Sequence, residues 1–181
     1  SYYGFNDFVI CAGYKQHMIK EWFADYFLHT SDVTFDFTQG NEMIVHDQHA
    51  EPWRVTVVDT GLNTMTGGRI KRVQKYIGNE TFMMTYGDGV CDVNIAELVK
   101  FHKQHGKLAT LTAVVQEPEV FDTISGDDTI FEQTPLRELA AKGQLMSYVH
   151  RGFWQCMDTV REKETLEKLW AQGQAPWKVW A

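Results

Sequence analysis

An aspartate between two glycines is the first feature of the sequence that could do chemistry. Tyr86-Gly87-Asp88-Gly89 ends the apolar run 81–86, and such runs are typical of strands buried in a parallel sheet. Glycines let the backbone approach a ligand closely, and a carboxylate beyond a strand end can hold Mg²⁺ together with phosphate oxygens and water. The same residues also suit a tight turn with no further role, so the local sequence leaves both interpretations open.

A pair of glycines at a predicted helix entrance is the second candidate. Thr64-Met65-Thr66-Gly67-Gly68-Arg69 leads into the predicted helix 69–77. A helix N-terminus attracts anions through its unpaired N–H groups and its dipole. The guanidinium of Arg69 adds a rigid fork that suits phosphate oxygens or the edge of a base. The alternative is a flexible loop that is capped by Thr66.

A second acidic residue, Asp158, follows the aromatic cluster that begins at Phe153 and precedes the predicted helix 160–172. Its alternative role is that Asp158 or Thr159 caps this helix. A metal site built around Asp88 would need a second carboxylate that is distant in the sequence, and Asp158 is the candidate for it.

The cysteines and histidines do not form a recognisable metal site. Cys11, Cys91 and Cys156 are far apart and lack the spacing of zinc ligands, so we expect buried free thiols in a reducing cytoplasm. None of the seven histidines is predicted to bind a metal, and His102 and His105 are expected on the outer side of their helix.

Segments with the patterns of strands and helices alternate along the chain, which predicts one α/β domain at 1–181. We expect a Rossmann-like, mostly parallel (mixed) sheet with helices on both faces, and a ligand beyond the carboxyl ends of its strands. The aromatics between Trp22 and Phe27 recur at helical spacing and are expected to pack in the core. The predicted strands are 5–11, 33–37, 43–45, 54–59, 81–86, 108–115 and 145–149, and the predicted helices are 14–28, 69–77, 94–105, 134–143 and 160–172.

The composition argues against several classes of protein. The chain has 181 residues, 44% of them hydrophobic, and a net charge of −7. A nucleic-acid-binding protein usually carries a basic patch, whereas the longest basic cluster here is Arg69-Ile70-Lys71-Arg72. No apolar run approaches the roughly 20 residues of a membrane-spanning helix. We therefore expect a cytoplasmic protein with a small anionic ligand and with neither nucleic acid nor membrane as a partner.

Taken together, these segments resemble the glucose-1-phosphate cytidylyltransferase branch of the sugar-1-phosphate nucleotidyltransferases, over nearly the whole chain. The strings that carry the resemblance are Cys11-Ala12-Gly13-Tyr14-Lys15, Trp22-Phe23-Ala24-Asp25-Tyr26-Phe27, Ser31-Asp32-Val33-Thr34-Phe35, Glu51-Pro52-Trp53, Val58-Asp59-Thr60-Gly61, Met65-Thr66-Gly67-Gly68-Arg69, Thr85-Tyr86-Gly87-Asp88-Gly89-Val90, Gly152-Phe153-Trp154-Gln155, Met157-Asp158-Thr159 and Ala175-Pro176-Trp177-Lys178.

The resemblance implies a reaction of CTP with glucose 1-phosphate that gives CDP-glucose and pyrophosphate, with Mg²⁺ as cofactor. It implies that Asp88 and Asp158 are the catalytic, metal-binding carboxylates. It also implies that Thr64, Arg69 and Gly87 bind the nucleotide beside Asp88. A homo-oligomer, a trimer or a hexamer, is expected, and the aromatics of the 22–37 region and the Trp-rich tail suit subunit contacts.

Two departures from the family pattern stand out. The family's glycine-rich G-G-x-G-T-R loop and the lysine after it do not precede Ser1, and its E-K-P and Asn-Gly-Gly regions are absent where Gln116 meets Glu117. We expect both segments to be missing from the sequence as given, and the chain as written not to catalyse the reaction. Two alternatives remain: a thymidylyl- or uridylyltransferase of the same fold, and a catalytically inactive regulatory or oligomerisation subunit.

Overall fold

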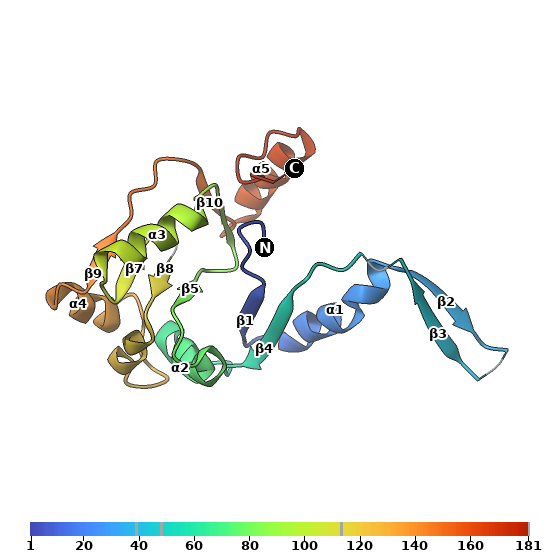
Figure 1. The fold of residues 1–181 in the computed structure, drawn as a ribbon, viewed down its shortest axis with the longest axis horizontal. Coiled ribbons are helices and arrows are strands. Elements are labelled where there is room, and N and C mark those ends of the chain that lie inside the picture. Colours follow the sequence, from blue (N-terminus) through green and yellow to red (C-terminus); the bar gives the residue numbers. More distant parts are fainter. Residues whose placement is uncertain (39, 48, 113, 181) are drawn as a thin grey trace. The chain divides into compact units, whose positions relative to one another are not determined.

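The computed structural model describes residues 1–38, 40–47, 49–112 and 114–180. The chain divides into two compact units, which are described separately below: unit 1, residues 3–64 with Ser1, and unit 2, residues 65–181 with Tyr2 (Figure 1). Among the described residues, the helices are all too short or too polar to cross a membrane.

Unit 1 contains a parallel pair of strands, a helix and a hairpin. Strand β1 (Asp7–Ala12) pairs in parallel with β4 (Arg54–Asp59), and β2 (Asp32–Asp36) pairs antiparallel with β3 (Glu42–His46). Helix α1 (Gln16–His29) follows β1. The sequence predicted these five elements to within a few residues.

Unit 2 is built around a mixed four-stranded sheet in the order β5-β8-β7-β9. A second ladder joins β6 and β10 antiparallel. The strands are β5 (Phe82–Met84), β6 (Gly89–Cys91), β7 (Ala109–Leu111), β8 (Val114–Gln116), β9 (Leu145–Ser147) and β10 (Trp154–Cys156). The helices are α2 (Thr66–Ile77), α3 (Ile95–His105), the short 3₁₀ helix η1 (Pro118–Thr123), α4 (Thr134–Ala141) and α5 (Val160–Ala171).

Helices cover both faces of the four-stranded sheet, as predicted. Side chains alternate between the two faces of a strand, and the register places Ala109 of β7 opposite Gln116 and Leu145. This face packs against residues of α2, η1 and α4, among them Phe121. Val115, one residue along β8, packs on the other face with Leu98 of α3 and Val93.

The pairing corrects two expectations. The predicted strand 108–115 is two strands, β7 and β8, which form an antiparallel hairpin. Strand β5 pairs antiparallel with β8 rather than lying in a parallel sheet, and parallel pairing is confined to β1–β4 and β7–β9 among the described ladders. The run 108–115 is rich in β-branched residues, which favour strand backbone on both sides of a turn, so composition does not reveal where the chain reverses.

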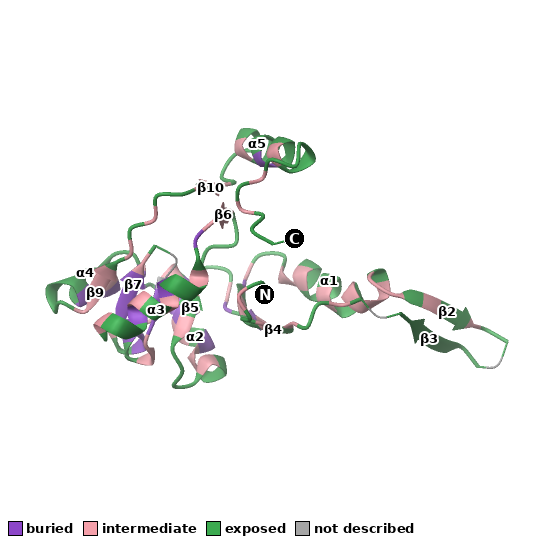
Figure 2. Ribbon diagram, turned by 45° about the horizontal axis from the view of Figure 1, so that its top comes forward, coloured by how far each residue is buried: buried purple, intermediate pink, exposed green. Residues whose placement is uncertain are grey.

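Burial corrects two further expectations. In Figure 2 the buried residues lie mostly in unit 2, and α1 buries none of its residues despite its aromatic stripe. Trp22 of this helix is 52% exposed. The three cysteines are free, as predicted, but Cys11 is exposed and the other two are half-buried, so the expectation of buried thiols is wrong.

Candidate functional site

The ladder between β6 and β10 brings the two predicted carboxylate segments together. Cys156 lies opposite Gly89 in this ladder, and the N–H of Met157 donates to the carbonyl oxygen of Asp88 at 2.7 Å. Asp158 is therefore one residue beyond the partner of Asp88, although 69 residues separate the two aspartates in the sequence. Both are exposed, which leaves them accessible to a ligand.

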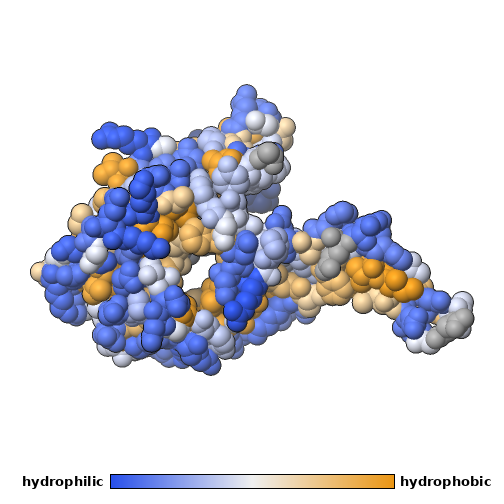
Figure 3. Space-filling model, in the orientation of Figure 1, coloured by the Kyte–Doolittle hydropathy of each residue, from blue (hydrophilic) through white to orange (hydrophobic). Residues whose placement is uncertain are grey.

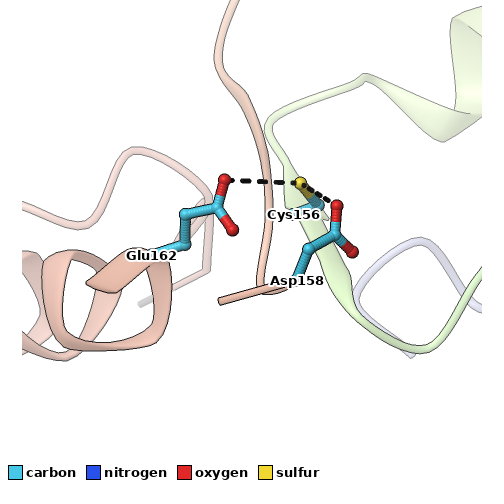
Figure 4. Close-up of side chains that lie close together, drawn as sticks. All are labelled: Cys156, Asp158 and Glu162. Atoms are coloured by element: carbon cyan, nitrogen blue, oxygen red, sulfur yellow. Dashed lines mark hydrogen bonds between the residues drawn. The ribbon is translucent and has the colours of Figure 1, made fainter. Parts of the chain in front are cut away.

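Asp158 has a thiol and a second carboxylate as neighbours (Figure 4). The Sγ of Cys156 donates to Asp158 Oδ2 at 3.2 Å, and one ligand atom each of Cys156, Asp158 and Glu162 lies within 4.8 Å of the others. The hydrogen bond to Asp158, with partial burial and the negative charges beside it, raises the pKa of the Cys156 thiol. Without a metal, the thiol therefore keeps its proton at neutral pH.

Glu162 has a structural task in the same place. Its Oε2 accepts from the backbone N–H of Thr159 at 2.9 Å and from the hydroxyl of Thr159 at 3.0 Å. The hydroxyl in turn accepts from the N–H of Glu162, which completes a capping box at the start of α5. The cap of this helix is therefore Thr159, one of the two residues predicted for it, and Asp158 does not have the capping role.

The residues present fit Mg²⁺ better than a softer metal. Mg²⁺ is usually held by one or two carboxylates together with substrate phosphates and water. Asp88 and Asp158 supply exposed carboxylates from neighbouring segments. Structural Zn²⁺ sites usually have four Cys or His ligands, whereas the cluster of Cys156, Asp158 and Glu162 contains a single cysteine and two carboxylates.

The start of α2 is closed by a segment from farther along the chain. The helix begins at Thr66 rather than at Arg69, so the glycines lie in its first turn. The N–H of Gly67 donates to the carbonyl oxygen of Thr129 at 2.8 Å, and a Cβ at Gly67 would lie 2.7 Å from that oxygen. Glycine is therefore required here for close packing, and one N–H expected to be open to an anion is already bonded.

Glu132 joins the start of α2 to the segment that carries Asp88. Its carboxylate accepts from the hydroxyl of Thr66 at 2.8 Å and from the hydroxyl of Tyr86. Partial desolvation, reinforced by the hydrogen bond to Glu132 and its charge, raises the pKa of Tyr86 to about 12. Partial desolvation alone would raise the pKa of Glu132, but the hydrogen bonds from Tyr86 and its other donors hold it below the usual value. No local pattern marked Glu132, because its partners lie 46 and 66 positions away.

The structure separates the predicted nucleotide-binding residues between the two units. Arg69, Gly87 and Asp88 belong to unit 2, whereas Thr64 is a buried residue at the end of unit 1. Arg69 is half-buried in the first turn of α2. The role of these residues in nucleotide binding stays a prediction.

His102 is a buried residue that the sequence placed wrongly on an outer helix surface. Its side chain is 1% exposed, with Nδ1 2.8 Å from the hydroxyl of Thr110 and Nε2 2.9 Å from a carboxylate oxygen of Glu117. The hydroxyl of Thr81 donates to the other oxygen of Glu117 at 2.9 Å. This network fastens α3 to the sheet and to the segment after β8, so we assign it a structural role.

The sequence is similar to curated enzymes over almost its whole length. It is 47% identical to the glucose-1-phosphate cytidylyltransferases of Salmonella typhimurium and Salmonella typhi, over 216 residues that cover 99% of this chain and 84% of each relative. It is 36% identical to a probable glucose-1-phosphate cytidylyltransferase of Bacillus subtilis, over 214 residues with the same coverage of both chains. No family model matches the sequence.

Solved structures share the fold at low sequence identity. Apo UDP-glucose pyrophosphorylase superposes with a TM-score of 0.67, covering 93% of this chain and 82% of that one at 13% identity. HddC from Yersinia pseudotuberculosis superposes with a TM-score of 0.64, covering 90% of this chain and 77% of that one, also at 13% identity. These likenesses confirm the predicted α/β fold class.

Proposed function

The chain belongs to the glucose-1-phosphate cytidylyltransferase family, and from this premise we propose that it transfers a cytidylyl group from CTP to glucose 1-phosphate, giving CDP-glucose and pyrophosphate. The observation that carries the proposal is the 47% identity over 99% of the chain. The protein is a nucleotidyltransferase, and the sugar phosphate is the acceptor in the proposed reaction.

The proposed reaction is an in-line attack by a phosphate oxygen of glucose 1-phosphate on the α-phosphorus of CTP. One P–O bond forms to the sugar phosphate while the bond to the β-phosphate breaks, and pyrophosphate leaves. Both reactants are anions, so the site must hold them together against their repulsion. Asp88 and Asp158 would hold Mg²⁺, which when bound neutralises the charge on the phosphate oxygens.

In this proposal Arg69, Thr64 and Gly87 bind the nucleotide rather than take part in the chemistry. Arg69 lies in the first turn of α2, where the helix dipole and the guanidinium both favour an anion. Gly87 is adjacent to Asp88, and open space surrounds the position where its Cβ would be. A phosphate or ribose could approach the backbone there without meeting a side chain.

The test is a pyrophosphate-release assay with glucose 1-phosphate and each of CTP, UTP, dTTP and GTP, using protein expressed from the complete coding sequence. We expect turnover with CTP to exceed that with the other nucleotides by at least tenfold. Equal or better turnover with dTTP or UTP would favour a thymidylyl- or uridylyltransferase. No turnover with any nucleotide, from a protein that is folded, would favour an inactive regulatory subunit.

We also propose that a segment is missing between Gln116 and Glu117. The alignment with the relatives spans 216 positions, whereas this chain has 181 residues. At least 35 of the aligned positions (216 less 181) therefore have no residue in this chain. Gln116 is fully buried with no hydrogen-bond partner for either polar atom of its amide. It lies on the apolar face of β8 beside Ala109, a poor place for an amide. Sequencing the transcript across codons 116 and 117 tests this proposal.

The glycine-rich segment expected ahead of Ser1 stays a prediction.

A homo-oligomer, a trimer or a hexamer, is the proposed assembly. Hydrophobic residues gather over the β2–β3 region in Figure 3, and Phe35, Phe37 and Ile44 are 55%, 75% and 44% exposed. An isolated two-stranded hairpin is only marginally stable in water, and a second copy of the chain offers a matching apolar surface. Sedimentation analysis checks the assembly.

A cytoplasmic location completes the proposal. It is supported by the three free cysteines, because disulfides are rare where thiols are kept reduced. Fractionation of the source cells would test it.

A further inference from the structure

The carboxylate of Asp92 joins the strand that follows Asp88 to the turn that precedes Asp158. Asp92 directly follows β6, and its Oδ1 accepts from the backbone N–H of Phe153 at 2.7 Å. Its own N–H donates to the carbonyl oxygen of Phe153 at 3.2 Å. The backbone and the side chain of Asp92 thus both bond Phe153, and these two bonds fix where the β6–β10 ladder begins.

His150 binds the same oxygen from the other end of the turn. Its Nε2 lies 2.7 Å from Asp92 Oδ1, and since a carboxylate only accepts, this ring nitrogen carries the proton. The side chains of His150 and Asp92 are 18% and 28% exposed, so water weakens the pair less than it would on the surface. The turn from His150 to Phe153 is therefore tied to Asp92 at both ends.

Gly152 shows how closely this turn fits around the carboxylate. A Cβ there would lie 2.3 Å from Asp92 Oδ1, 2.8 Å from Oδ2 and 2.7 Å from a ring carbon of His150. These distances are far below van der Waals contact, so any side chain at Gly152 would displace the carboxylate. Glycine is required here by the close approach of Asp92.

The ladder held in this way is short. It pairs three residues of β6 with three of β10, and an isolated pair of that length is marginal in water. Its far end carries the bond from Met157 to Asp88. A slip by one residue would break the bond between Met157 and Asp88 and would turn every side chain of β10 to the other face of the ladder.

We propose that Asp92 is a positioning residue for the divalent-metal site: by holding the His150–Phe153 turn it sets the β6–β10 register that brings the segment of Asp158 beside the segment of Asp88. The proposal rests on the proposed function, in which these two carboxylates hold the metal. Asp92 itself does not bind the metal in this proposal and acts only through the turn. Residues that orient metal ligands typically change metal affinity by 10- to 100-fold when they are replaced.

The experiment compares Asp92→Ala, Asp92→Asn and Gly152→Ala with the unchanged protein, all made from the complete coding sequence. Asp122→Ala is the matched control, because Asp122 is an exposed aspartate of η1 in the same unit. Two quantities are measured for each: the binding of Mn²⁺, followed by electron paramagnetic resonance of the free ion with and without CTP, and the Mg²⁺ concentration that gives half-maximal turnover. Circular dichroism verifies that each variant is folded.

We expect Asp92→Ala and Gly152→Ala to weaken Mn²⁺ binding at least tenfold and to raise the half-maximal Mg²⁺ concentration by a similar factor. Asp92→Asn keeps an oxygen that accepts from Phe153 and should recover most of the affinity, and Asp122→Ala should match the unchanged protein. Unchanged Mn²⁺ binding in the folded Gly152→Ala and Asp92→Ala variants would overturn the proposal. If Asp92→Ala does not fold, Gly152→Ala decides alone. An unchanged protein that binds Mn²⁺ but makes no CDP-glucose would instead contradict the proposed function.

Discussion

Units 1 and 2 carry similar patterns of apolar residues but bury them to very different extents. In the described part of unit 1 the buried residues are Ala12, Val58, Thr60 and Thr64. Unit 2 buries large side chains such as Phe121 and Leu98 completely. The sheet of unit 2 is covered on both faces, whereas every residue of β3 is exposed.

The difference shows that an amphipathic pattern predicts a face to be covered but does not say what covers it. Helix α1 has an aromatic stripe, in which the ring of Tyr26 contacts the rings of both Trp22 and Trp53. No residue of the helix is buried, however. Exposed apolar area of this kind favours a contact with another surface. In unit 2, by contrast, helices of the same unit cover both apolar faces of the sheet.

One substitution in each unit tests this contrast directly. Phe121→Ala should lower the free energy of unfolding by about 3–5 kcal/mol, because the removed ring leaves a cavity in a close-packed core. Phe121 is fully buried and stacks on Phe82 with ring centroids 5.1 Å apart. Urea unfolding at low protein concentration measures it. Trp22→Ala in unit 1 is the matched control and should change stability by about 1 kcal/mol or less; an equal loss from both would remove the contrast.

The second expected effect concerns the chemistry in unit 2. Asp88→Asn or Asp158→Asn should lower kcat by about 100- to 1000-fold, or roughly 3–4 kcal/mol, because an amide holds a divalent cation poorly. Both residues are exposed, so the urea midpoint should hardly move. Steady-state kinetics at saturating CTP and Mg²⁺ provide the measurement. A variant with normal kcat would remove that aspartate from the catalytic site.

Arg69→Ala should have a smaller effect and on a different parameter. We expect the KM for CTP to rise about tenfold with little change in kcat, since a residue that binds substrate and transition state equally affects KM alone. The matched comparison is Arg137→Ala, which alters an exposed arginine of α4 and should leave KM unchanged. A loss of thermal stability without any change in KM would make Arg69 a packing residue.

Gln116→Leu should stabilise the 181-residue chain by about 1–2 kcal/mol. A buried amide without partners is unfavourable by about 1–3 kcal/mol, and leucine has a similar volume with no polar atoms. Gln116 has neither amide atom bonded. Thermal unfolding of the two chains side by side gives the answer. A lower melting temperature for the variant would mean that the amide of Gln116 has hydrogen-bond partners in solution, and it would contradict this prediction.

A substitution in the β2–β3 hairpin of unit 1 is expected to have the smallest effect on unfolding. Phe35→Ser should leave unfolding of the dissociated chain nearly unchanged but shift the oligomer toward smaller species, because it removes exposed apolar area from the proposed contact. Tyr76→Ser, at a 48% exposed aromatic of unit 2, is the control. Sedimentation velocity measures the distribution of oligomers for the two variants. The same assembly for Phe35→Ser and the unchanged protein would place the subunit contact elsewhere.

Local patterns predicted most elements and the ends of several helices. Gly106 ends α3 in the left-handed conformation, as expected of glycine after a helix. Asn94 caps α3 through the N–H of Glu97, whereas Asp92, two residues earlier, binds the turn at His150 and Phe153 instead. Both residues are good caps by type, so only the fold could decide between them.

Residue type and local spacing alone identified the candidates for chemistry, namely Asp88, Asp158 and the glycine-led helix. The sequence also identified the family, because the matching strings run along the whole chain. The fold was needed to show that the segment of Asp158 lies beside that of Asp88, that Asp92 and Glu132 hold the segments around them, and that His102 is buried. The physical reason is that the periods of helices and strands are local, whereas strand register and buried hydrogen bonds join residues that are far apart in the chain.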